Sequence, residues 1–276
     1  MSTQRKLSGR RVVITGGARG IGLATAREFA KRGATVVIGD LTAAAVAAGV
    51  AAIGSSAEGY VLDVTDHESF SDFYAKASAA GPVDVLINNA GIMPIGHFEQ
   101  QQPEIQRRAV EVNVMGCISG LQLAVTDMRT RGRGHIINVA SAAGKSPVPG
   151  GLVYCGTKAA VVMMTETARM EYAGSGIEFT CVMPNFTNTE LIAGTTSTRF
   201  IPMASPEQVA TAIADAVARP KADVIVPAVM TPALKAQPFL PRRLRDRFAK
   251  LIGADKAFLT FDPNARSTYD ARISAE

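Results

Sequence analysis

The sequence predicts a three-layer α/β fold built on a doubly wound parallel sheet of about seven strands. Short apolar runs alternate with helix-like segments along most of the 276 residues. Strict alternation implies right-handed crossovers, with helices on both faces of the sheet. Runs such as VVIT and VLIN are apolar throughout, as expected for strands buried on both sides. We find no internal repeat or linker, so we expect a single domain over residues 1–229 with a C-terminal helical extension over 230–276.

Each expected strand is a run of β-branched or other apolar residues followed by a turn or a polar residue. The first is Arg11–Thr15, which ends at two glycines and leads into a helix over 21–31 that stops at Gly33. The further strands are expected at 34–39, 59–62, 83–87, 135–139, 177–182 and Asp223–Val226.

The expected helices fall between these strands. A helix start is clearest at Ser205, because serine is a good cap, Pro206 takes the first helical position and Gln208 follows three residues after the cap. The other helices are expected at 43–52, 67–79, 103–129 and from about Tyr154 to Tyr172.

Composition points to a globular protein of a reducing compartment. Hydrophobic residues make up 47% and charged residues 19% of the chain, which argues against disorder. We expect no span of the ~18 apolar residues that a bilayer requires, no signal peptide and a cytoplasmic location. The chain has three cysteines, which are far apart in sequence, so we expect no disulfide framework. With three histidines besides, we expect no metal site.

The net charge of +5 is concentrated in the tail. Residues 230–276 hold nine Lys/Arg and five Asp/Glu, whereas the rest of the chain is nearly balanced. A nucleic-acid-binding domain would need a basic face on its main body, so we expect no nucleic-acid partner.

A glycine-rich turn, TGGARGIG at 15–22, joins the first strand to the first helix. Glycines allow a pyrophosphate to approach the free N–H groups and the positive dipole end of the helix. The spacing differs from the usual GxGxxG, but a strand before it and a helix after it favour dinucleotide binding. The expected contacts in this turn are Gly16, Arg19, Gly20, Ile21 and Gly22.

Asp40 ends the second strand, 18 residues after Gly22. A carboxylate there can accept hydrogen bonds from both ribose hydroxyls and repels a 2′-phosphate, which favours NAD over NADP. Arg19 argues the other way, because it could pair with that phosphate. Asp63 and Val64 end the third strand, where Asp63 either holds the adenine amino group or caps the next helix.

The segment YCGTK carries the expected catalytic pair. Tyr154 and Lys158 are four residues apart, on one face of a helix. A phenol has an ordinary pKa of ~10, and a nearby ammonium lowers this pKa toward the range that acid/base catalysis needs. Ser141 ends the preceding strand, and its hydroxyl could stabilise charge on a substrate oxygen.

Taken together, these motifs resemble the short-chain dehydrogenase/reductase family, which has a Rossmann-like fold. The turn at 15–22, Asp63-Val64, NNAG at 88–91, Asn113, Ser141 and YCGTK at 154–158 match in order and spacing, over about residues 8 to 228.

The resemblance implies an NAD(P)-dependent oxidoreductase that interconverts a secondary or primary alcohol and a ketone or aldehyde. Tyr154 would then be the proton donor or acceptor, and Lys158 would hold the nicotinamide ribose and lower the tyrosine pKa. Ser141 would orient the substrate oxygen, and Asn113 would fix a helix kink and a water of a proton relay. The further cofactor contacts that it implies are Asn89, Ala90, Gly91, Pro184, Thr187 and Thr189.

Two departures from the family pattern bear on the cofactor contacts and the assembly. Asn185 replaces the glycine that usually follows the proline at 184, which affects the contact of Thr187 or Thr189 with the carboxamide. The chain also continues well past Pro227, where relatives with a tetramer often end. A homodimer through the helices of Asn113 and Tyr154 is therefore the safer expectation, with a homotetramer as the alternative.

The segments expected to wall the substrate, at 92–98, 142–151 and 191–203, carry few charges. They favour an apolar alcohol or ketone, such as a steroid, terpenoid, retinoid or fatty alcohol. The stretch 191–202 is rich in small residues and is expected to form a lid, and His97 is expected to be solvated. An NADPH-dependent 3-oxoacyl reductase and a catalytically silent nucleotide-binding regulator are the alternatives.

The tail contains an amphipathic pattern. Leu240, Leu244, Phe248 and Leu251 fall at helical spacing among five basic residues. We expect this stripe to pack against the body or against another subunit. Peripheral contact with an anionic membrane is the alternative.

Overall fold

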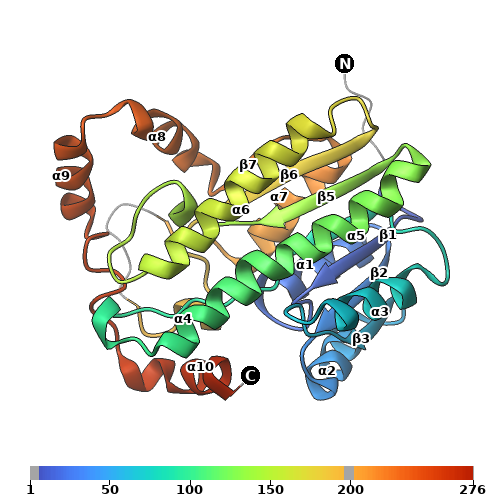
Figure 1. The fold of residues 1–276 in the computed structure, drawn as a ribbon, viewed down its shortest axis with the longest axis horizontal. Helices are drawn as coiled ribbons and strands as arrows, with labels where there is room; N and C mark the ends of the chain where they lie inside the picture. Colours follow the sequence, from blue (N-terminus) through green and yellow to red (C-terminus); the bar gives the residue numbers. More distant parts are fainter. Residues whose placement is uncertain (1–5, 196–201, 276) are drawn as a thin grey trace.

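The computed structural model describes residues 6–195 and 202–275. It contains a seven-stranded sheet in the order β3-β2-β1-β4-β5-β6-β7, in which all neighbouring strands are parallel (Figure 1). The predicted parallel α/β fold is therefore confirmed. The strands are β1 (Arg11–Thr15), β2 (Thr35–Asp40), β3 (Ala57–Val61), β4 (Val85–Asn88), β5 (Gly134–Val139), β6 (Ile177–Pro184) and β7 (Asp223–Val226).

Helices cover both faces of the sheet, as the alternation of elements requires. The first face is covered by α1 (Gly20–Lys31), α2 (Ala43–Ile53) and α7 (Pro206–Ala218). The second face is covered by α3 (His67–Ser78), α5 (Gly116–Arg131) and α6 (Leu152–Glu171). The short helix α4 (Pro103–Val110) precedes α5, and three helices follow β7, namely α8 (Thr231–Ala236), α9 (Arg242–Ile252) and α10 (Pro263–Ala275).

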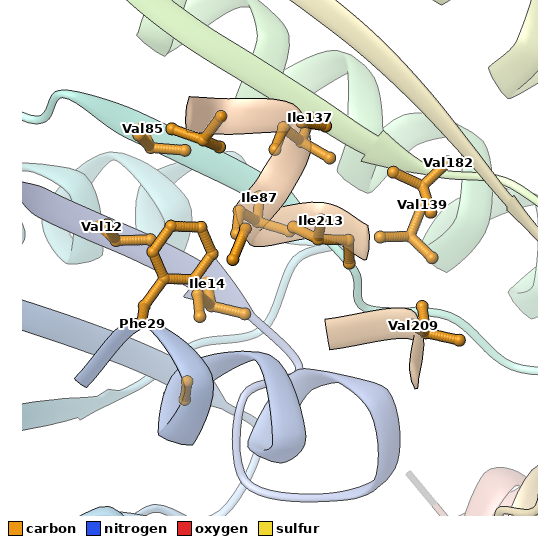
Figure 2. Close-up of a cluster of buried hydrophobic side chains, with 14 of the residues drawn as sticks. Val12, Ile14, Phe29, Val85, Ile87, Ile137, Val139, Val182, Val209 and Ile213 are labelled. Atoms are coloured by element: carbon orange, nitrogen blue, oxygen red, sulfur yellow. The ribbon is translucent and has the colours of Figure 1, made fainter. Parts of the chain in front are cut away.

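The core follows the two-residue period of the strands. On β1, Val12 and Ile14 face α1 and α7, whereas Val13 faces the α3 and α5 layer. Figure 2 shows the first of these layers, where Phe29 of α1 and Ile213 of α7 meet the strand side chains. Each side chain of this size contributes about 1.5–3 kcal/mol when it is fully buried.

The long helical stretch predicted at 103–129 is present, and it is interrupted at Asn113, where the resemblance implies a kink. Residues Glu111–Met115 form a π-helical segment between α4 and α5. A π-helical turn inserts an extra residue into the helix and often marks a functional position, and this one contains Asn113. Most other boundaries agree within two residues. The capping box at Ser205 and Gln208 is present as predicted.

Within the described residues, one helical run, Pro103–Arg131, is long and apolar enough to cross a membrane by length and composition. The expectation that no segment passes such a test was therefore wrong. This run packs against β4, β5 and α6, and it buries Gly120, Ala124 and Met128. About 33% of its apolar window is buried, so packing against the sheet accounts for part of its apolar composition.

The C-terminal extension returns to the body through α10. Arg266 is fully buried and donates hydrogen bonds to the carbonyl oxygens of Leu191, at 2.7 Å, and Met93. It also forms an ion pair with Asp270 at 2.9 Å. The hydroxyl of Tyr269 accepts a hydrogen bond from the Met93 N–H at 2.9 Å. These contacts fasten α10 to the loops that follow β4 and β6.

The expected lid at 191–202 lies partly outside the described residues, because 196–201 are not described. Its first part is attached to the extension. The Gly194 carbonyl accepts a hydrogen bond from the Asp262 N–H at 2.9 Å, and Thr195 forms a bridge with Phe261. The described part of this segment is therefore held by residues that come much later in the chain.

The amphipathic stripe of the tail lies on α9 and the residue before its cap. The expectation that it packs against the body is wrong, because Leu240, Leu244, Phe248 and Leu251 are all exposed. Helices α8 and α9 stand at the left-hand edge of the view in Figure 1, away from α2 and α3. The body contacts of this part of the chain are instead made by Leu234 and Ile252, which are buried.

The two arginines of α10 provide a test of what fastens the extension. Arg266→Met leaves two buried carbonyl groups without their donor, so we expect it to lower the free energy of unfolding by about 3 kcal/mol. Arg272→Met removes an ion pair with Glu190, whose side chain is 63% exposed, and should cost less than about 1 kcal/mol. Urea denaturation of both variants measures the difference, and equal losses would contradict this account of α10.

Candidate active site

A large cavity of about 460 Å³ opens at the carboxyl ends of the strands, where parallel α/β sheets bind ligands. Of the residues that the sequence predicts for the cofactor or the chemistry, all but Gly22 and Asn113 line it. These lining residues are Gly16, Arg19, Gly20, Ile21, Asp40, Asp63, Val64, Asn89, Ala90, Gly91, Ser141, Tyr154, Lys158, Pro184, Thr187 and Thr189.

The glycine turn packs too tightly for side chains at two positions. A Cβ on Gly16, whose φ is +62°, would lie 2.9 Å from the Cα of Ala90. A Cβ on Gly22 would lie 2.1 Å from the Gly16 carbonyl oxygen. Gly22 was predicted as a cofactor contact, but it lies behind the cavity wall and permits the turn itself. No side chain caps the start of α1, so the cavity meets a bare helix N-terminus.

The loop after β4 is tied to this turn by hydrogen bonds. The Asn89 side-chain amide donates to the carbonyl oxygens of Thr15 and Gly16, at 3.0 and 2.9 Å. The Thr15 hydroxyl accepts from the N–H groups of Asn89 and Ala90, at 3.0 and 3.1 Å. Asn89 therefore shapes the cavity wall in addition to lining it.

The carboxylate of Asp40 lies at the end of β2, beside the glycine turn. It accepts hydrogen bonds from the N–H groups of Ala18 and Leu41, each at 3.0 Å. Arg19 lines the same part of the cavity. The structure thus places Asp40, which favours NAD, and Arg19, which favours NADP, along the same cavity.

Asp63 does not cap the helix that follows it, so that interpretation is wrong. The cap of α3 is Asp66, which accepts from the N–H of Glu68 at 2.9 Å. Asp63 instead accepts from the N–H and the hydroxyl of Thr65, at 2.9 and 2.7 Å. With Val64, it lines the cavity next to Asp40.

The other end of the cavity holds Ser141, Tyr154 and Lys158. Tyr154 and Lys158 lie one turn apart on α6 and are both buried. The Lys158 ammonium donates to the Val139 carbonyl oxygen at 2.9 Å and lies 5.9 Å from the centroid of the Tyr154 ring. Ser141 begins the short helical turn Ala142–Gly144 at the end of β5, opposite α6.

The electrostatics of this end differ from expectation. Burial raises the pKa of Tyr154, and a hydrogen bond with Ser141 opposes this rise. Burial lowers the pKa of Lys158 to about 8. The prediction that Tyr154 has a lowered pKa is therefore wrong for this arrangement, because desolvation of the phenolate outweighs the stabilising contacts. The phenol is protonated at neutral pH and is available as a proton donor.

Asn113 lies beside the cavity and connects three segments. Its side-chain oxygen accepts from the Ile92 N–H at 2.8 Å, and its amide donates to the Ile92 carbonyl oxygen and the Thr157 hydroxyl, at 2.9 and 3.0 Å. It borders a smaller cavity that Lys158 also lines. Asn113 thereby holds the loop after β4 against α6.

The strand β6 and the loop after it complete the wall. Backbone pairing continues one residue past β6, since the Asn185 N–H donates to the Val226 carbonyl oxygen at 2.8 Å. The Thr187 hydroxyl then donates to the Asn185 carbonyl oxygen at 2.9 Å. A Cβ on Gly20 would lie 3.4 Å from Thr189, so this loop approaches the glycine turn from the opposite side.

The substrate end of the cavity is apolar. Of the segments expected to wall it, Ile92, Met93, Val148 and Leu191 contribute side chains. His97 is exposed and does not line the cavity, as expected.

Residues of the C-terminal extension also line the cavity, and the sequence analysis missed them. They are Phe258, Tyr269, Arg272 and Ile273. The spacing of Arg266, Tyr269 and Ile273 by three and four residues is a helix-face signal that could have indicated one buried side of this segment.

Comparison with known proteins agrees with this geometry. Residues 10–199 match the family described as short chain dehydrogenase. The chain is 39% identical, over 192 residues, to a 2,5-dichloro-2,5-cyclohexadiene-1,4-diol dehydrogenase of Sphingobium indicum, which covers 68% of this chain and 77% of that protein. It is 37% identical, over 215 residues, to a cis-4-hydroxycyclohexanecarboxylate dehydrogenase of Sinomonas cyclohexanicum, covering 73% and 86% of the two chains.

Solved structures show the same architecture. A 3-ketoacyl-(acyl-carrier-protein) reductase from Brucella melitensis, complexed with NADH, aligns with a TM-score of 0.72 and 28% identity over 80% of this chain and 97% of that one. A short chain dehydrogenase/reductase from Burkholderia phymatum, in complex with NAD, aligns with a TM-score of 0.78 at 24% identity over 85% and 95%.

The cavity at the strand ends, the paired Tyr154 and Lys158, and the match over most of the sheet lead to one conclusion. The chain belongs to the short chain dehydrogenase family and is an oxidoreductase that acts on CH–OH groups with a nicotinamide cofactor.

Proposed function

We propose that this protein is an NAD-dependent dehydrogenase that interconverts an apolar secondary alcohol and its ketone, with Tyr154 as the acid/base. The observation that carries the proposal is the single cavity that joins the glycine turn and Asp40 at one end to Ser141, Tyr154 and Lys158 at the other. An extended dinucleotide fits such a cavity with its two ends in different chemical surroundings.

The residues at the nucleotide end fit NAD. The bare N-terminus of α1 supplies N–H groups for the pyrophosphate. Asp40 lies at the cavity wall and retains free oxygen lone pairs for ribose hydroxyls, since each of its oxygens accepts one backbone hydrogen bond. A 2′-phosphate would be repelled by this carboxylate, and this repulsion outweighs the attraction of the solvent-exposed Arg19.

The bound cofactor would supply the hydride acceptor or donor. The chain's own groups manage the proton and the orientation. In reduction, the protonated Tyr154 donates its proton to the carbonyl oxygen, and in oxidation the phenolate accepts the proton of the alcohol. Ser141 lines the same cavity as Tyr154 and orients the same oxygen. Lys158 places its positive charge close to the tyrosine ring and favours the phenolate.

The substrate end favours an apolar ring. Met93, Phe186, Leu191 and Phe258 belong to one apolar cluster with Tyr154. Two relatives carry names of dehydrogenases for six-membered rings that bear hydroxyl groups. Both the cluster and these names support a cyclic secondary alcohol as the first substrate class to test.

A ketoacyl reductase is the second candidate, because one structural relative at 28% identity has that name. A long acyl chain would also suit apolar walls. That relative was solved with NADH, and Asp40 disfavours the NADPH-dependent form of this reaction. A catalytically silent regulator is less well supported, because Asn113, Ser141, Tyr154 and Lys158 all retain side chains suited to the chemistry.

The assembly that we propose is a homodimer through the outer faces of α4, α5 and α6. Met115 of the π-helical segment, Ile118 of α5, and Met163 and Met170 of α6 are exposed, and apolar residues of this kind are enriched in the cores of interfaces. Sedimentation velocity of the full chain measures the state directly, and Met163→Glu should shift it toward the monomer.

Tyr154→Phe tests the mechanism. Removal of the hydroxyl eliminates proton transfer, so kcat on cyclic secondary alcohols should fall by roughly 10²–10⁴-fold, whereas the Kd for NADH should change little. Tyr172→Phe, at the opposite end of the same helix and away from the cavity, is the control. A Tyr154→Phe enzyme with near-normal kcat would refute the proposed role.

Asp40→Ala tests the cofactor. Loss of the carboxylate removes both the ribose acceptor and the repulsion, so the ratio of kcat/KM for NADH over NADPH should fall by about 10- to 100-fold. Arg19→Gln is the matched variant at the opposing residue and should raise this ratio slightly, because it removes the cation that could pair with a 2′-phosphate. The preference for NAD is wrong if wild type favours NADPH and Arg19→Gln abolishes that preference.

A further inference from the structure

The outer face of α9 combines exposed apolar side chains with a row of basic ones. Leu244, Phe248 and Leu251 are spaced by four and three residues and therefore share one face of the helix. Leu240 precedes the helix by two residues and is exposed as well. The exposed fractions are 44% for Leu240, 50% for Leu244, 54% for Phe248 and 65% for Leu251, although these side chains are ones that folding normally buries.

This face is not the one that contacts the body. Ile252, which is buried, and Arg245 and Ala249, which are half-buried, lie on the adjacent side of α9. Phe239, just before Leu240, has an exposed fraction of 87%. Five exposed large apolar side chains thus occur within 13 residues of α9 and the segment before it; we call them the α9 surface, which consists of Phe239, Leu240, Leu244, Phe248 and Leu251.

The charges around the α9 surface are of one sign. Arg243, Arg247 and Lys250 each stand one residue before Leu244, Phe248 and Leu251, so they form a parallel row along its edge. Residues 239–252 contain five basic residues and one acidic residue, Asp246, a net charge of +4 in a chain whose total is +5. A partner for this surface must be apolar at its centre and anionic at its border.

A second copy of the chain meets the first requirement but not the second. Pairing two α9 surfaces would bring two basic rows together, and like charges at an interface oppose association. A bilayer with anionic phospholipids meets both requirements. Its acyl region accepts the apolar side chains and its headgroups attract the arginines and the lysine.

We propose that α9, with Phe239 and Leu240, lies in the interface of a membrane that contains anionic phospholipids. The helix is parallel to the membrane plane, with its apolar side chains among the upper acyl chains and its basic row at the phosphates. Binding is peripheral and reversible, because a single short helix buries far less apolar surface than a membrane-spanning one.

The α9 surface is close in sequence to the substrate wall. The segment after α9 leads within six residues to Phe258, which lines the cavity and packs edge-on against Phe186 with ring centroids 5.6 Å apart. The backbone of Phe258 approaches Gly150 so closely that a Cβ there would lie 2.6 Å from it. The proposed membrane-binding helix therefore ends six residues before a residue of the apolar wall of the active site.

Liposome co-sedimentation of the full chain tests this proposal without reference to turnover. Vesicles of phosphatidylcholine alone are compared with vesicles that also contain phosphatidylserine. We expect binding to the anionic vesicles to be at least about tenfold stronger and to weaken with added salt. Absence of binding to the anionic vesicles by wild type would overturn the proposal.

Two variants separate the apolar and the basic contributions. Leu244→Gln/Phe248→Gln removes apolar contacts, and Arg243→Gln/Arg247→Gln/Lys250→Gln removes the basic row, so each should weaken binding by about tenfold or more. Lys31→Gln/Arg133→Gln/Lys221→Gln removes the same charge from exposed positions elsewhere and should bind as wild type does. If this control loses as much vesicle binding as the α9 variants do, binding depends on net charge alone and the role of α9 is overturned.

Thermal unfolding and sedimentation velocity complete the test. The substituted side chains of α9 are exposed, so the Tm should stay within a few degrees of wild type, which excludes misfolding as the cause of lost binding. If wild type does not bind anionic vesicles and Leu244→Gln/Phe248→Gln dissociates an oligomer, the α9 surface is an interface between copies of the chain and the proposal is wrong.

Discussion

Parallel pairing of β1 with β2 on one side and β4 on the other is the constraint on which the site depends. In this register Thr15 lies opposite Gly39 and Ile14 lies opposite Ile87, so the three strands end at the same level. Parallel strands must all turn at one edge. The glycine turn, Asp40 and Asn89 meet there although they are far apart in the chain, and a shift of one residue would separate them and turn the core side chains outward.

Hydrogen bonds from polar side chains then hold the loops that the sheet brings together. Asn89 ties the β4 loop to the glycine turn, and Asn113 ties the same loop to α6 through Ile92 and Thr157. Buried polar groups that are fully bonded specify one arrangement more strongly than apolar contacts do. These contacts set the position of Tyr154 relative to the nucleotide end of the cavity. The same packing of the β4 loop against α6 accompanies the burial of its phenol.

The extension after β7 contributes one helix that packs against the body and one whose apolar face is exposed. Its last helix turns inward, where buried Arg266 bonds to the loops after β4 and β6 and Tyr269 enters the cavity wall. Its middle helix turns outward and leaves Phe248 and its neighbours exposed. Of the two helices only α9 is strongly amphipathic, yet its apolar face is exposed, whereas α10 buries an arginine. Sequence periodicity marks an apolar face but does not say what covers it.

Local pattern was enough to predict the parallel α/β fold, the family, and the chemistry expected at Ser141, Tyr154 and Lys158, because strand burial, helix capping and motif spacing are short-range signals. It was not enough for features that depend on contacts between distant segments. The π-helical segment at Asn113, the placement of Gly22 behind the cavity wall and the raised pKa of Tyr154 all arise from packing. The reason is physical: desolvation, close approach and partner choice depend on distances in space, which the tertiary structure alone decides.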